Sequence, residues 1–86
     1  MQVIKITATG LAFTGHASVE GISLIPDTAE STIVLNDSLT GLGDDKGEVK
    51  TQKEYSKEVS LYGQMFSTGI YATLTGSGAV AYIYVR

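Results

Sequence analysis

The residues whose types come closest to a hydrolytic site are His16, Ser18 and Glu20. His16 is the only histidine in the chain. A catalytic histidine needs a nucleophile on one side and an orienting carboxylate on the other. Ser18 and Glu20 are near it in the sequence, but side chains along one extended strand splay apart and do not converge on one substrate. We therefore expect His16 to be a solvated turn residue and the chain not to be an enzyme.

A second group of candidate residues is acidic, with Asp37, Asp44, Asp45 and Glu48 in one stretch. Calcium requires several carboxylate and carbonyl oxygens at about 2.3–2.6 Å, but the spacing does not match the D-x-D-x-D-G loop and Lys46 would repel a cation. As a carboxylate pair for glycoside hydrolysis the group is weaker, because two acids on one flexible loop have no fixed separation. We expect a solvated loop that binds no metal and no cofactor.

Two glycine pairs, Gly41-x-Gly43 and Gly76-x-Gly78, have the spacing seen in phosphate-binding loops. Neither is followed by a helix carrying the Lys-Ser/Thr pair that such a loop requires. We interpret both as turn residues.

The tyrosines offer three alternative roles. Their rings could fill a core with the hydroxyls at its edge, anchor a protein interface, or stack on the sugar rings of a ligand. The sequence leaves these roles open for Tyr55, Tyr62, Tyr71, Tyr82 and Tyr84.

Length and composition indicate one small globular domain over residues 1–86. The chain is 43% hydrophobic and 17% charged, which is enough apolar material for a core but only a thin one. It has no cysteine, so neither a disulfide nor a thiolate metal site can stabilise it. Oligomerisation, or docking on a larger body, is the remaining common source of stability for a domain of this size.

The charge balance also limits the partners. A net charge of −3 argues against nucleic acid and against an anionic membrane surface. No apolar run approaches the roughly 20 residues that span a bilayer. The first five residues lack the basic start and long apolar run of a signal peptide, so we expect synthesis in the cytoplasm.

The strongest structural signal is β. Glycines recur at short intervals and the segments between them alternate polar with β-branched, aliphatic or aromatic residues. This pattern predicts an all-β fold, a small antiparallel β-sandwich or jelly-roll-like barrel of about seven to eight short strands. We expect strands at 2–9, 17–25, 30–36, 57–62, 70–75 and 79–86, a short piece at 11–14 that leads to a turn at Gly15–His16, and 48–55 as an edge strand or one helical turn. We further expect a bulge or close packing at Gly21, a long loop at 36–47, a short connection at 64–68 and a hairpin turn at Ser77–Gly78.

The last segment is the most informative. One of its faces carries Ala79, Ala81, Ile83 and Val85, and the other carries Val80, Tyr82 and Tyr84. Because both faces are apolar or amphipathic, this strand should be central in its sheet or its second face should meet another surface. The candidate interface residues are therefore Val80, Tyr82 and Tyr84, together with Leu39 and Leu42 of the long loop.

Residues 64–86 resemble the ending of small tailed-phage virion proteins, in which F-x-x-G-[IL]-Y is followed by L-x-G-x-G-A-x-x-x-[VI]-Y. Residues 32–37 are similar to the V-x-L-[YN]-D strand of the same proteins. The likeness covers about half the chain, while residues 41–55 depart from it and are more charged. The matching residues in the ending are Phe66, Gly69, Ile70, Tyr71, Leu74, Gly76, Gly78, Ala79 and Tyr82 or Tyr84.

The resemblance implies a jelly-roll-like β-sandwich present in many copies on a phage particle. The implied function is that of a capsid decoration (cement) protein, made in the host cytoplasm and located on the virion. Its implied partners are the major capsid protein and copies of itself in a homotrimer. The alternative is a head-fibre, tail or spike module that binds a host surface glycan or protein through exposed tyrosines and the loop at 36–47.

Overall fold

The computed structural model describes Gln2–Arg86, and every regular element in that range is a β-strand. The all-β fold expected from the alternating pattern is confirmed. No helix long and apolar enough to cross a membrane occurs within this range. The strands are β1 (Gln2–Ile6), β2 (Gly10–Thr14), β3 (Ala17–Ile25), β4 (Ser31–Asp37), β5 (Asp44–Thr51), β6 (Lys57–Phe66), β7 (Gly69–Thr75) and β8 (Val80–Val85).

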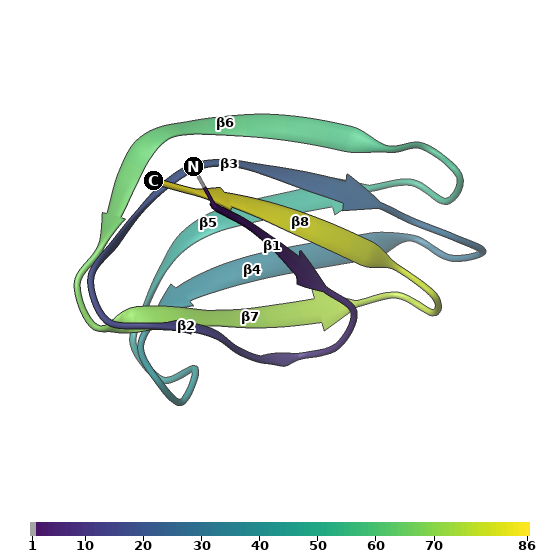
Figure 1. The fold of residues 1–86 in the computed structure, drawn as a ribbon. Coiled ribbons are helices and arrows are strands. Elements are labelled where there is room, and N and C mark those ends of the chain that lie inside the picture. The colour runs from purple at the N-terminus through teal and green to yellow at the C-terminus, as the bar shows by residue number, and fades with distance from the viewer. Residues whose placement is uncertain (1) are drawn as a thin grey trace.

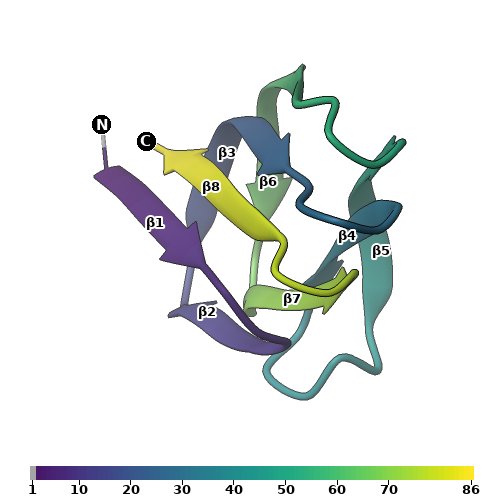
Figure 2. The same cartoon turned by 90° about the vertical axis from the view of Figure 1, so that its right-hand side faces the viewer.

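The strands form two antiparallel four-stranded sheets that pack face to face (Figures 1 and 2). The first sheet has the order β1-β8-β3-β6 and the second β2-β7-β4-β5. The pairs β1–β8, β2–β7, β3–β6 and β4–β5 are nested, as in one long hairpin that has been rolled into two layers. This nesting is the jelly-roll arrangement.

The core lies between the sheets and follows the period of two along each strand. In β4, Ile33 and Leu35 are buried while Thr32 and Val34 are only partly covered, as the alternation predicts. The same pattern holds in β7 and β8. The largest fully buried side chains are Phe66, Ile22, Leu24, Ile33, Leu35, Ile70 and Ile83.

The last strand is central in its sheet, which is one of the two explanations expected for its two apolar faces. β8 lies between β1 and β3, and its inward residues Ala81, Ile83 and Val85 are buried in the core. Its outward residues Tyr82 and Tyr84 remain half-buried on the outside of the first sheet. The central position therefore accounts for one apolar face of β8, and the other face still meets solvent.

The expected hairpin at Ser77–Gly78 is wrong. β7 belongs to the second sheet and β8 to the first, so the turn carries the chain between layers. Gly76 and Gly78 both have positive φ, and the Ala79 amide donates to the Gly76 carbonyl at 3.3 Å. This local geometry is turn-like, but which strand pairs with which is decided by packing across the sandwich.

Three expected strand boundaries are also wrong. The first strand ends at Ile6, which leaves residues 7–9 as an exposed connection to the second sheet. The segment expected as a connection at 64–68 instead continues β6 up to Phe66. The long loop is shorter than expected because β5 begins at Asp44, where it pairs with Asp37 of β4. The segment at 48–55 is an edge strand as far as Thr51, the first of its two alternatives.

Candidate docking surfaces

The outside of the first sheet carries an apolar surface that we call the tyrosine face, formed by Val3, Ile25, Val80, Tyr82 and Tyr84. Register places Tyr84 opposite Val3 on β1 and Val80 opposite Ile25 on β3. Val3 is 55% exposed, and Ile25 is also exposed. Because cross-strand partners share a face, these residues from three adjacent strands lie on one surface, which also contains Lys5 and Ser23, the partners of Tyr82 on β1 and β3.

Hydrogen bonds fix the position of Tyr84. Its hydroxyl is 2.9 Å from Ser23 Oγ, and Ser23 Oγ donates to Glu58 Oε2 at 3.2 Å. Since the single hydroxyl proton of Ser23 goes to Glu58, the Tyr84 hydroxyl is the donor to Ser23. These hydrogen bonds hold the ring of Tyr84 in place on the outside of the first sheet.

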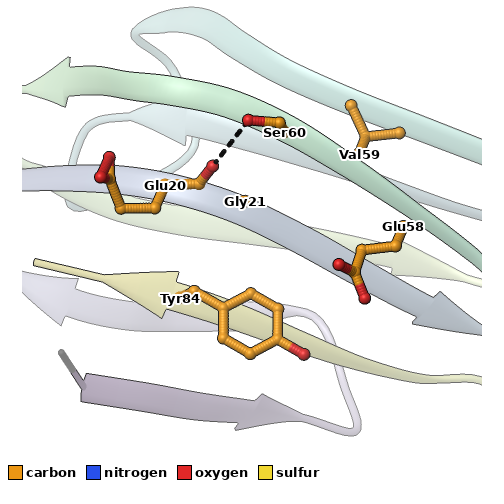
Figure 3. Close-up of a pocket in the computed structure, with 6 residues that line it drawn as sticks. All are labelled: Glu20, Gly21, Glu58, Val59, Ser60 and Tyr84. Carbon is orange, nitrogen blue, oxygen red and sulfur yellow. Dashed lines mark hydrogen bonds between the residues drawn. The ribbon is translucent and has the colours of Figure 1, made fainter.

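Beside this ring lies an open groove of about 250 Å³ (Figure 3). Gly21 is one of the residues that line it, and a Cβ on this residue would approach the Val59 carbonyl oxygen to 3.0 Å, so β3 and β6 pack closely there. The expectation of a bulge or close packing at Gly21 is confirmed on both counts, since the register of β3 with β6 and with β8 shifts between Val19 and Gly21. The groove offers a polar ligand the ring of Tyr84, the hydroxyl of Ser60 and the carboxylates of Glu20 and Glu58.

Another apolar surface, the leucine patch, consists of Leu11, Leu39 and Tyr71 on the outside of the second sheet together with Leu42, which is exposed in the same loop as Leu39. Leu11 is the cross-strand partner of Tyr71. A Cβ on Gly69 would come within 2.7 Å of Leu39 Cδ2, so Leu39 lies against the strand that holds Tyr71. Leu42 is 90% exposed, the highest value among the aliphatic side chains of this patch.

The loop at 38–43, which carries Leu39 and Leu42, is organised by Asn36. This side chain is only 4% exposed, and its amide nitrogen donates to the Gly43 carbonyl and to Asp45 Oδ1, both at 2.8 Å. Its oxygen accepts from the Gly43 amide at 2.9 Å and from Ser38 Oγ. Ser38 Oγ in turn accepts from the Gly41 amide at 2.7 Å. The loop is thus cross-linked to the end of β4 at several points.

Asp37 fastens the neighbouring turn between β6 and β7. Its carboxylate accepts hydrogen bonds from the backbone amides of Thr68, Ser67 and Gly69, and Lys46 Nζ lies 3.3 Å from Oδ2. The amides of Thr68 and Ser67 are the main cause that holds the pKa of this carboxyl well below its usual value, with Gly69 and Lys46 adding to the effect. The charged Asp37 side chain therefore holds the turn between β6 and β7 against the end of β4.

The five interface residues expected from the sequence fall into two sets. Val80, Tyr82 and Tyr84 lie on the tyrosine face, whereas Leu39 and Leu42 lie on the leucine patch of the other sheet. The sequence argument missed their neighbours Val3, Ile25 and Leu11, and it left the role of Tyr71 open. Ile25 points outward because the register of β3 shifts between Val19 and Gly21, and the pairing of Leu11 with Tyr71 required the sheet order.

The residues considered for catalysis or metal binding do not converge. His16 is exposed on the turn between β2 and β3, and Glu20 is paired with Arg86 at 3.4 Å. Asp45 accepts from Asn36, while Asp37 clamps the β6–β7 turn. Within Gln2–Arg86 no group of three or more His, Asp or Glu side chains is arranged to hold a metal ion.

Tyr62 is the most exposed large hydrophobic side chain of the first sheet, at 91%. It has φ of 53°, and Gly63 has φ of 77°. These two residues form a bulge on β6, because Gly21 and Val19 pair with Ser60 and Gln64 respectively. A left-handed conformation is unfavourable for a non-glycine residue, so the bulge holds the ring of Tyr62 in solvent at a cost.

We expect Tyr62→Gly to leave the free energy of unfolding unchanged or to raise it by up to about 1 kcal/mol. Glycine removes a left-handed strain of roughly 1–2 kcal/mol, offset in part by its greater freedom in the unfolded chain. Tyr62→Val should be destabilising, because a β-branched residue tolerates this conformation poorly. Urea denaturation followed by circular dichroism measures both. A clear loss of stability in the glycine variant would mean that the ring makes structural contacts.

Comparison with protein-family models, with curated protein sequences and with solved structures finds no match to this chain.

Proposed function

We propose that the chain is a structural protein of a tailed-phage virion, a capsid decoration protein that binds and stabilises the head shell. The resemblance of residues 64–86 to small virion proteins supports this function. So does the nested eight-strand topology, because jelly rolls of this kind are frequent in viral capsid domains. A shared fold does not by itself assign a function, so the surfaces must carry the argument.

The single observation that carries the proposal is the presence of separate apolar surfaces on the outside of both sheets. Val3 at 55% exposure and Leu42 at 90% mark the two surfaces, the tyrosine face and the leucine patch. A small domain with apolar contacts on two sides can join two bodies. That is the role of a cement protein, which bridges neighbouring subunits.

In this proposal the two surfaces have different partners. The tyrosine face joins copies of the chain into a homotrimer, and the leucine patch docks on the major capsid protein. Each contact is small, but a trimer engages the shell at three points at once. Linked contacts raise the overall affinity well above that of one contact, by about 10²–10⁴-fold in linked systems.

The proposal is tested on virions from a culture that expresses the gene. Particles purified on a density gradient should contain the chain in many copies, as measured by quantitative mass spectrometry. Particles from a strain with the gene deleted should lose their DNA at a lower temperature than wild-type particles. Absence of the chain from purified virions would remove the proposal.

The trimer is tested with Val3→Glu. Val3 is exposed in the single chain, so the charge should not disturb the fold, but it would bury a carboxylate in the tyrosine face of an assembly. Sedimentation equilibrium should show a trimer for the wild type and a monomer for the variant, with equal circular dichroism spectra. If both sediment as monomers, the tyrosine face does not join copies of the chain.

A second function, binding of a host surface glycan, is favoured by Tyr62 and the groove beside Tyr84. A strained, exposed aromatic ring and a groove with carboxylate and hydroxyl groups are features that sugars can use, by stacking and by hydrogen bonding. Tyr71 fits this role less well, because it is half-buried beneath the loop at 38–43. Binding to a glycan array that is lost in Tyr62→Ser, with host attachment reduced, would favour this function over the first.

A further inference from the structure

The loop at 38–43 combines rigidity with exposure in a way that the fold does not require. All the hydrogen-bonding capacity of the buried Asn36 amide group is used to hold the loop, through Gly43, Asp45 and Ser38. Yet the residue this network presents, Leu42, is 90% exposed and contributes almost nothing to the core. A leucine in solvent is common, but a leucine displayed by a fully satisfied buried polar network is not explained by stability of the domain.

We propose that Leu42 is an anchor residue that inserts into an apolar pocket of a protein partner, and that this pocket is bordered by lysine or arginine side chains. A loop already held in its bound conformation loses little entropy when it docks, which is the general advantage of preorganisation. Leu39 of the same loop is also exposed and would add a second apolar contact to the partner.

The charges next to the leucine patch indicate which side chains should border the pocket of the partner. Asp44 and Asp45 are exposed directly after the loop, while the nearest cation, Lys46, is occupied by Asp37 and by the Met65 carbonyl at 3.1 Å. The patch therefore presents apolar side chains beside uncompensated negative charge. A basic border on the partner would complement it and speed association.

The same charges argue against a second copy of the chain as the occupant. A two-fold contact would place the same patch on both sides of the interface and so bring the carboxylates of both copies into one contact without a basic partner. Like charges across an interface are unfavourable and suppress such pairings. The occupant is therefore a different protein. This inference rests on the proposed function, according to which that protein is the major capsid protein.

The test uses particles that lack the chain, titrated with purified full-length chain. Leu42→Ser should weaken binding by about 30-fold, the typical loss for an interface hot spot. Met65→Ser is the matched control, since it also shortens an exposed apolar residue but belongs to neither the tyrosine face nor the leucine patch, and it should change the affinity by less than about 3-fold. Asp44→Asn combined with Asp45→Asn should weaken binding and flatten its dependence on salt. Equal affinities for wild type and Leu42→Ser would overturn the anchor.

A second measurement separates failure of the anchor from failure of the proposed function. A photo-crosslinking amino acid replaces Leu42 in cells that make the complete set of virion proteins, with the same substitution at Lys53 as the control. Crosslinks from position 42 should outnumber those from position 53 and map beside lysine or arginine on one protein. If that protein is not a capsid protein, the anchor stands and the decoration function fails. Crosslinks only to copies of the chain, to lipid, or to nothing would overturn the anchor.

Discussion

Replacing Phe66 by alanine should lower the free energy of unfolding by about 3–5 kcal/mol. The ring is 0% exposed and is the largest fully buried side chain of the core. Truncation loses its transfer free energy and leaves a cavity between the two sheets, because a sandwich of paired strands cannot collapse freely around the gap. A chain of this length is expected to have only about 4–13 kcal/mol of stability in total, so this loss would remove from about a quarter to all of it.

Equilibrium denaturation in urea, followed by far-ultraviolet circular dichroism, measures this change. Phe66→Leu keeps most of the volume and should cost about 1 kcal/mol or slightly more. Met65→Ala is the exposed neighbour on the same strand and should cost less than about 1 kcal/mol. A Phe66→Ala protein whose midpoint matches that of Met65→Ala would contradict the position of this ring in the core.

Replacing Asp37 by asparagine should give the second large effect, a marked fall in the melting temperature at pH 7. The carboxylate accepts from the amides of Ser67, Thr68 and Gly69, and its side chain is only 8% exposed. An asparagine amide nitrogen in place of one oxygen would face these donors with another donor. Asp44→Asn removes the same charge from an exposed position and should change the melting temperature little.

The Asp37 effect should also depend on pH in a defined direction. Its pKa is lower in the folded chain than the ordinary value of 3.8. Above that value the carboxyl is charged in both states, and its full contribution to stability is present. As the pH falls below about 4, the unfolded chain binds a proton that the folded chain does not, so the contribution is progressively lost. The gap in melting temperature between wild type and Asp37→Asn should therefore narrow from pH 7 toward pH 2.5, and a gap that stays constant would show that the charge is not what matters.

The sequence predicted the elements best where a strand has one clearly buried face. In β4, β7 and β8 the expected inward residues Ile33, Leu35, Ile70, Ala72, Ala81, Ile83 and Val85 are buried, while Leu74 is only partly buried. Prediction was poorest where a local signal competed with pairing. Gly63 suggested the end of a strand, yet β6 passes through a bulge there and continues to Phe66, because β3 offers it partners up to Ala17.

Some residues of the candidate surfaces were predicted from the sequence, but their arrangement was not. Leu39 and Leu42 were named as loop residues of an interface, and both are exposed. The role of Asn36 and Asp37 could not be read from the chain, because Ser67 and Thr68, the partners of Asp37, are distant in sequence. The homotrimer, the capsid partner and the location on the virion stay predictions.

The sequence by itself determined the strand-forming character of this protein, since the alternation of polar and apolar residues is a local property with the period of the pleat. It also determined that the two faces of the last strand would both be apolar. Only the tertiary structure decided which strands are neighbours, and so divided the apolar residues between a tyrosine face and a leucine patch on opposite sheets. The physical reason is that pairing between strands far apart in the chain depends on the joint burial of both sheets, which no short segment encodes.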